Sequence, residues 1–251
     1  MDKRQWGAAV LGDRADLDQW TSVLKPPFDP WIELHREETI LRSASMENLS
    51  TAGEVRDWCV ACMERLNGAM ALDRASKPVR LGSIVEFGPK GELHRAIFPG
   101  VVEVELRLFP GTVTVTNMGP DGKLHSPPPR PTRVQTWARL ADDDELLDDA
   151  LVYFGRSADW FDIYKALECL ILRFGGSKAK KREAVFLSLG WAPADEISRL
   201  KRTANAARHA RKRYDPPANP MSVKKAHALL GTLLRRAFDE VASNPPPRAL
   251  P

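Results

Sequence analysis

The hydrophobic pattern of this chain changes its period near Asp142, and this change constrains the fold more than any other feature. Before it, segments such as 83–87 alternate apolar and polar residues, as strands with one buried face do. After it, apolar residues recur at the i, i+3, i+4, i+7 spacing of amphipathic helices. A strand-rich part followed by a helix-rich part is typical of the α+β class. We therefore predict a mixed α/β domain with an antiparallel sheet over residues 1–141 and a helical domain over residues 142–251.

The alternation of apolar and polar residues, together with the glycines and prolines of turns, predicts the helices and strands of residues 1–141. Glycine and proline at 88–91 and 109–111 are typical of turns that join antiparallel strands. Helices are expected at residues 16–24 and 53–72, and a last strand at 133–138. The other expected strands are residues 8–11, 31–34, 39–43, 83–87, 101–109 and 111–116.

Three helices are expected in the second part, at residues 160–174, from Pro193 to about Arg213, and from Ser222 to Val241. Residues 187–191 are expected to form a short apolar connector. The two outer helices should bury their apolar faces against each other. The residues expected to be largely buried together are Trp160, Leu167, Leu170, Ile171, Leu230, Leu233 and Phe238.

Composition excludes several classes of protein. The chain has 251 residues, 43% of them hydrophobic, yet no run approaches the roughly 18 apolar residues of a membrane helix. Three cysteines do not make a disulfide framework, which is typical of a reducing compartment, so we expect a cytoplasmic protein with no membrane partner. Cys59 and Cys62 form a C-x-x-C pair, but they lie on the apolar stripe of the expected 53–72 helix and are interpreted as core residues.

Signature motifs of phosphate-binding loops, dinucleotide-binding folds, zinc proteases and α/β-hydrolases are absent from the sequence. We therefore expect no cofactor and no bound metal.

The charge is unevenly distributed along the chain. The net charge is +4, but residues 178–213 hold eleven Lys/Arg against three acids, an excess of +8, so the other 215 residues sum to −4. Much of that negative charge lies in residues 142–149. A concentrated positive segment on a slightly acidic protein is typical of a contact with a polyanion. The alternative is a solvated basic helix face that pairs with the acidic run.

The basic segment contains a second pattern, at residues 201–209. On a helix of 3.6 residues per turn, Arg202, Asn205 and His209 share one face. The apolar face opposite them is expected to be buried, and it consists of Ile197, Leu200, Ala204 and Ala207. Arginine, amide and histidine should therefore face solvent, a partner or a ligand.

The order of elements after residue 150 resembles the HEPN superfamily. The resemblance covers about residues 150–243: a long apolar helix, a helix with Arg202 followed by His209 after a gap of six residues, a proline-rich break and a closing amphipathic helix. The commoner motif has a polar residue directly after the arginine and a gap of four residues before the histidine. Here Thr203 follows Arg202 and the gap is six. The resemblance implies a small helical bundle, metal-independent ribonuclease activity, and Arg/His pairs that meet at a dimer interface.

Such a site would use histidine for proton transfer and arginine to stabilise charge on the phosphate. We expect Arg202 and His209 as the catalytic pair, with Asn205 orienting His209 or binding phosphate. The residues expected to contact RNA are Lys201, Arg208, Arg211 and Lys212.

Three functions are open at this point. The first is a nucleic-acid-directed HEPN-like protein that cleaves RNA, and the second is a relative that binds RNA without cleaving it. The third is a non-enzymatic dimerising adaptor or sensor, whose N-terminal half binds a protein or a small molecule. The expected partners are RNA and a second copy of the chain.

Overall fold

The N-terminal half is a five-stranded antiparallel sheet with two helices packed on it. The structure, a computed structural model, describes residues 5–88, 92–98, 129–156, 159–209 and 215–244. The first elements are β1 (Gln5–Leu11), α1 (Arg14–Val23), β2 (Trp31–His35), β3 (Glu38–Arg42), a 3-10 turn (Ala44–Asn48), α2 (Ala52–Arg74), β4 (Arg80–Phe87) and β5 (Leu93–Ala96). The strand order is β2-β3-β1-β4-β5, and each neighbouring pair is antiparallel.

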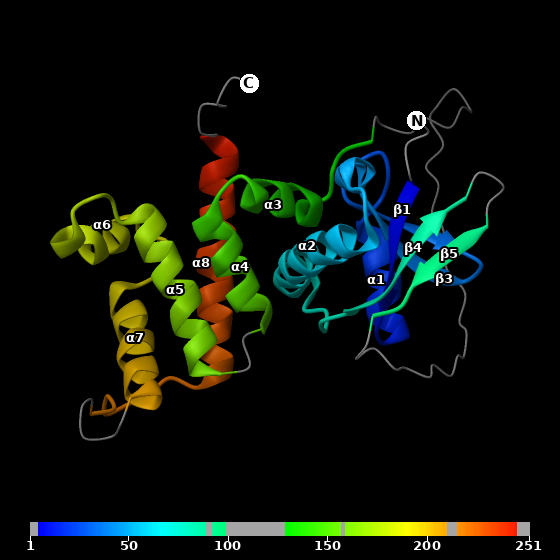
Figure 1. The fold of residues 1–251 in the computed structure, drawn as a ribbon. Helices are drawn as coiled ribbons and strands as arrows, with labels where there is room; N and C mark the ends of the chain where they lie inside the picture. Colours follow the sequence, from blue (N-terminus) through cyan, green and yellow to red (C-terminus); the bar gives the residue numbers. More distant parts are fainter. Residues whose placement is uncertain (1–4, 89–91, 99–128, 157–158, 210–214, 245–251) are drawn as a thin grey trace, which may run out of the picture.

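This topology contains two interlocked split β-α-β units. Strand β3 lies between β1 and β2, and β1 lies between β3 and β4, so each helix connects two parallel strands that are separated by one other strand. Alternation along β1 produces the two faces, because Trp6, Ala8 and Val10 join the main core with the helices while Ala9 lies in a small cluster on the opposite face. Figure 1 shows α1 and α2 beside the sheet.

Most expected N-terminal elements are confirmed. The described strands include the expected segments 8–11, 31–34 and 83–87, the 39–43 segment forms β3, and the helices at 16–24 and 53–72 are α1 and α2. The expected strands at 101–109 and 111–116 lie outside the described residues.

The strand expected at residues 133–138 is wrong, because this segment begins helix α3 (Arg133–Asp142). Thr132 caps the helix, and its side chain and that of Gln135 satisfy each other's backbone N–H groups. The buried side chains of this segment follow a helical spacing and comprise Val134, Gln135, Trp137, Ala138, Leu140 and Ala141.

The C-terminal half is helical, as predicted. It consists of α4 (Glu145–Arg156), α5 (Trp160–Phe174), a 3-10 turn (Ala179–Lys181), α6 (Arg182–Ser188), α7 (Ala194–Arg208) and α8 (Val223–Ser243). Helix α8 packs against α3, α4 and α5 (Figure 1). The expected connector at 187–191 is wrong for its first two residues, because residues 187 and 188 are the last residues of α6. Of the residues expected to be buried together, Trp160 and Ile171 are half-buried and the other five are buried.

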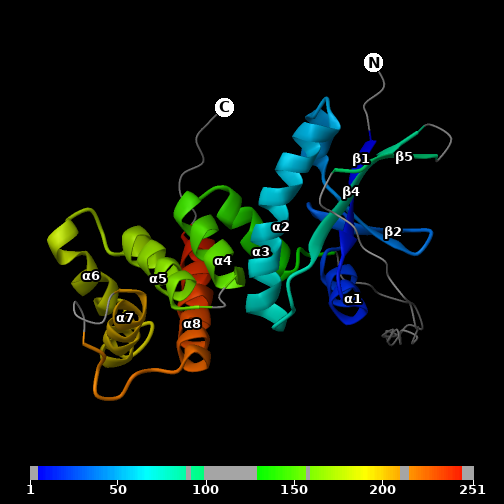
Figure 2. The ribbon, with the colours of Figure 1, turned by 60° about the horizontal axis from the view of Figure 1, so that its bottom comes forward.

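The two halves are joined where α2 crosses α4. At this crossing Gly68 lies so close to α4 that a Cβ atom there would be 2.1 Å from the carbonyl oxygen of Leu151. Arg65 of α2 forms a two-pronged ion pair with Asp148 of α4, with N–O distances of 2.7 and 3.1 Å, and also pairs with Asp142. One hydrophobic cluster runs through residues of both halves, and Figure 2 shows α2 lying between the sheet and the helical part.

Candidate basic surface on the 3-10 turn and helix α7

The basic segment lies on the 3-10 turn, α6 and α7, at the end of the molecule away from the sheet (Figure 1). Lys178, Lys180, Lys181 and Arg202 are exposed, and we call these four residues the basic surface. Within the described ranges, none of the four has a hydrogen-bond or ion-pair partner on its side chain. Arg211 and Lys212, which were also expected to contact RNA, lie outside the described residues.

Other cations of the same elements have partners. Lys201 of α7 pairs with Glu183 of α6, and this contact fixes α7 beside the start of α6. Arg199 pairs with Glu196 at 3.3 Å, and Lys225 of α8 reaches the same carboxylate at 2.8 Å. The hydrogen bond from Lys225, together with the positive charge of Lys225 and Arg199, lowers the pKa of Glu196 below its usual value. Arg182 donates to the Gly176 carbonyl at 3.1 Å and Arg208 to the Asn205 side chain at 2.9 Å, so these two arginines have polar but not acidic partners among the described residues.

The acidic run does not neutralise the basic surface. Among the described residues, Asp142 and Asp148 pair with Arg65, and Asp144 pairs with Arg173 of α5. Burial lowers the pKa of Arg65, but its hydrogen bonds and charge interactions with the two aspartates outweigh this and raise it. The acidic run therefore serves contacts with α2 and α5.

Helix α7 exposes Arg202 because its opposite side is packed. Asp195 and Glu196 in the first turn favour the positive end of the helix. The buried residues of α7 are Ile197, Leu200, Thr203 and Ala204. Thr203 contributes a polar contact to this face, since its hydroxyl donates to the Arg199 carbonyl at 2.8 Å and accepts the Met221 N–H at 3.1 Å.

Two expectations for this helix are wrong. Ala207, expected in the core, is exposed, because the buried side of α7 is centred closer to Thr203. The helix was expected to run to about Arg213 but ends at Arg208. His209 is its C-cap: the His209 N–H donates to the Asn205 carbonyl at 3.1 Å, and the His209 backbone is extended, with φ −101° and ψ 160°.

The residues that lie around His209 differ from the expected set. A guanidinium nitrogen of Arg208 donates to the Asn205 side-chain oxygen at 2.9 Å and lies 3.4 Å from Nε2 of His209. The same guanidinium stacks on Tyr164 of α5, 3.6 Å from the ring centroid. Asn205 is close to His209 as expected, but the arginine beside it is Arg208. Sequence analysis did not indicate Tyr164 as a site residue, since the spacing of residues within one helix carries no signal of a contact with another helix.

Cys59 and Cys62 lie in the core, as predicted, and so does Cys169. Cys59, Cys62 and Cys169 are buried, and burial raises the pKa of Cys59 to about 12 and that of Cys169 to about 11. Protonated, buried thiols are poor nucleophiles and poor metal ligands. Within the described ranges, no group of three or more His, Cys, Asp or Glu side chains could hold a metal ion. None of the described helices combines the length and apolar character needed to cross a bilayer.

Comparisons with known proteins give no relative for this chain. No protein-family model, curated protein or solved structure matches it.

Proposed function

We propose that this protein binds RNA through the basic surface of its helical half. The observation that carries the proposal is the separation of charge on the 3-10 turn and α7: the four cations of the basic surface are exposed and have no acidic partner within the described part of the chain, while Lys201 and Arg199 are paired. The pattern resembling the HEPN superfamily on the same helices also supports an RNA-directed role.

Electrostatics favours a phosphate backbone as the partner of such a surface. Lysine and arginine that neutralise phosphates release condensed counterions, and this release provides most of the affinity for a polyanion. Lys181 is two residues before Glu183, the partner of Lys201, so the basic 3-10 turn lies near the part of α7 that carries Arg202. A strand of RNA could contact both elements at once.

Charge reversal tests the proposal. The variant Lys178→Glu/Lys180→Glu/Lys181→Glu should bind a mixed-sequence single-stranded RNA about tenfold or more weakly than the wild type, because three phosphate contacts become repulsive. The matched control is Lys25→Glu/Arg139→Glu/Arg236→Glu, which reverses three exposed cations elsewhere on the described surface and so makes the same change of net charge. Equal weakening by the two variants in a fluorescence-anisotropy titration would contradict a defined basic surface.

Cleavage of the bound RNA is a second candidate function, and the contacts of Arg208 with Asn205 and His209 favour it. We propose His209 as the proton-transfer group and Arg208, in place of Arg202, as the cation beside the phosphate. This activity should persist in EDTA and give cyclic-phosphate ends. His209→Ala should remove it while RNA affinity is kept, with His94→Ala, an exposed histidine on β5, as control. Cleavage that His209→Ala leaves intact would refute this role.

A further inference from the structure

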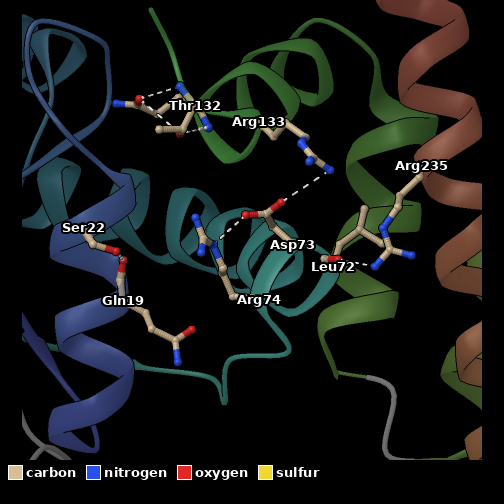
Figure 3. Close-up of polar contacts among 9 residues, drawn as sticks. Gln19, Ser22, Leu72, Asp73, Arg74, Thr132, Arg133 and Arg235 are labelled. Carbon is tan, nitrogen blue, oxygen red and sulfur yellow. Dashed lines mark hydrogen bonds and ion pairs between the residues drawn. The ribbon is translucent and has the colours of Figure 1, made fainter. Parts of the chain in front are cut away.

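A polar cavity lies where the end of α2 meets the beginning of α3. It has a volume of about 310 Å³ and is lined by Asp73, Arg74, Thr132 and Arg133. Figure 3 shows these side chains between α1 and α8, with Arg235 of α8 nearby. The cavity is distant in sequence from the basic surface and shares no residue with it.

Two arginines of different helices converge on one carboxylate in this cavity. Nε of Arg74 donates to Asp73 at 2.9 Å, and Nη1 of Arg133 lies 3.9 Å from the other carboxylate oxygen (Figure 3). The Arg74 and Arg133 side chains are 54% and 72% exposed, whereas Asp73 is 14% exposed. Arg235 donates to the Leu72 carbonyl at 2.6 Å and adds a third guanidinium at this end of α2.

Hydrogen-bond donors are in excess here. A guanidinium has five N–H donors. Within the described part of the chain, the Arg74 side chain uses one of them, on Asp73, and that of Arg133 has no acceptor within hydrogen-bond distance. Two arginines against one aspartate leave the lining with one uncompensated positive charge. The cavity therefore favours an incoming anion with several acceptor atoms.

The start of α3 adds to this preference. The cavity is lined by the N-cap Thr132 and by Arg133, the first residue of a ten-residue helix. The capping pair of Thr132 and Gln135 satisfies the backbone N–H groups of those two residues, which leaves the N–H groups of Arg133 and Val134 without a partner inside the helix. The helix dipole places partial positive charge at the same end. Asp73 already lies at this end of α3 as an anion. A phosphate group can accept from both guanidinium groups and from the helix end at once.

We propose that this cavity binds the phosphate group of a small phosphorylated molecule. Its volume is at the lower end of the range for small-molecule sites, about 300 to 1,000 Å³, which leaves room for a phosphate and a small organic portion. Because the lining residues come from the end of α2 and the start of α3, the bound ligand would connect these two helices.

A phosphorus NMR titration with inorganic phosphate tests the site. Arg74→Gln/Arg133→Gln should weaken binding about tenfold or more, because two charge-assisted contacts are lost. The control Arg139→Gln/Arg236→Gln removes the same charge from exposed positions and should bind like the wild type, as should Lys178→Glu/Lys180→Glu/Lys181→Glu. The last comparison separates this site from the RNA surface. Absence of phosphate binding by the wild type, or equal weakening by the control, would overturn the proposal.

Asp73→Asn gives a readout that a purely structural ion pair would not produce. Removing this carboxylate's charge should tighten phosphate binding, because the competing anion is gone while the arginines remain. Unchanged or weaker binding by Asp73→Asn would contradict the proposal.

Glycerol phosphate and a 5′-phosphorylated RNA then identify the source of the phosphate. Dependence of glycerol phosphate binding on Arg74 and Arg133 supports the small-molecule site. If binding of the 5′-phosphorylated RNA depends on these arginines and binding of glycerol phosphate does not, the site binds an RNA end, and the small-molecule assignment is overturned.

Discussion

Gln135 is a buried polar residue whose amide group holds together segments far apart in the sequence. Its side-chain nitrogen contacts the carbonyl oxygens of Lys25, Phe28 and Pro30 at 3.0, 3.0 and 3.1 Å, and its oxygen accepts from Thr132. Only 2% of the residue is exposed. The loop between α1 and β2 therefore depends on a donor from α3, about one hundred residues later.

At this scale we predict that Gln135→Leu destabilises the protein by about 2 to 4 kcal/mol, because buried carbonyl oxygens lose their donor. The control Arg139→Leu introduces the same side chain at an exposed position of the same helix and should change the free energy of unfolding by less than about 0.5 kcal/mol. Urea unfolding measures both. Equal effects would show that the Gln135 contacts do not stabilise the loop.

Residue-scale features were the hardest to predict from the sequence. The contact of Gln135 with three carbonyl groups depends on the path of a distant loop. The spacing of residues near Gln135 in the sequence therefore cannot predict this contact. The exposure of Arg202 and the burial of Leu200 followed from helical periodicity and are confirmed. The position of His209 could not be derived in this way, because no glycine or proline marks the end of α7 before Asp215-Pro216.

At the scale of elements, the crossing of α2 and α4 depends on two glycines. Besides the contact of Gly68 with Leu151, a Cβ atom on Gly155 would lie 2.7 Å from Cα of Gly68. Both neighbours are backbone atoms, which cannot move without shifting a helix. Small residues at this crossing allow the two helices to approach closely.

We predict that Gly68→Ala destabilises the protein by about 2 kcal/mol or more, because the added methyl group forces the two helices apart. The matched control is Gly231→Ala on α8, where the nearest atom to the new Cβ is Cζ of Phe154 at 3.4 Å. That change should stabilise the protein by up to about 1 kcal/mol, since alanine is the better helix former. Thermal unfolding of the two variants should move in opposite directions, and a stabilising Gly68→Ala would refute the close crossing.

Elements with long, regular periodicity were predicted well. Helices α2, α5 and α8 lie within a few residues of their expected positions, because each has an apolar stripe over several turns. The short α3 was assigned to a strand since few residues define its period, although the pairing of Thr132 with Gln135 is a recognisable capping signal. The cavity that Asp73 and Arg133 line joins segments sixty residues apart, so the sequence could not indicate it.

At the scale of the whole molecule, one hydrophobic cluster connects the sheet-bearing half to the helical half. We therefore predict that the two halves unfold together. Thiol labelling tests this with variants that keep one cysteine each, Cys59 in α2 or Cys169 in α5, both buried. The two thiols should become reactive with the same dependence on urea concentration. Exposure of Cys169 at clearly lower urea than Cys59 would instead indicate two independently folding domains on either side of residue 141.

The salt dependence of RNA binding tests the proposed function most directly, because it counts the phosphates that the protein neutralises. Contacts by Lys178, Lys180, Lys181 and Arg202 predict a plot of log affinity against log salt concentration with a slope of about −3 for single-stranded RNA. The Lys178→Glu/Lys180→Glu/Lys181→Glu variant should give a slope of clearly smaller magnitude at every RNA sequence tested. A wild-type affinity that does not change with salt, or no RNA binding even at low salt, would contradict the proposal that the basic surface binds RNA.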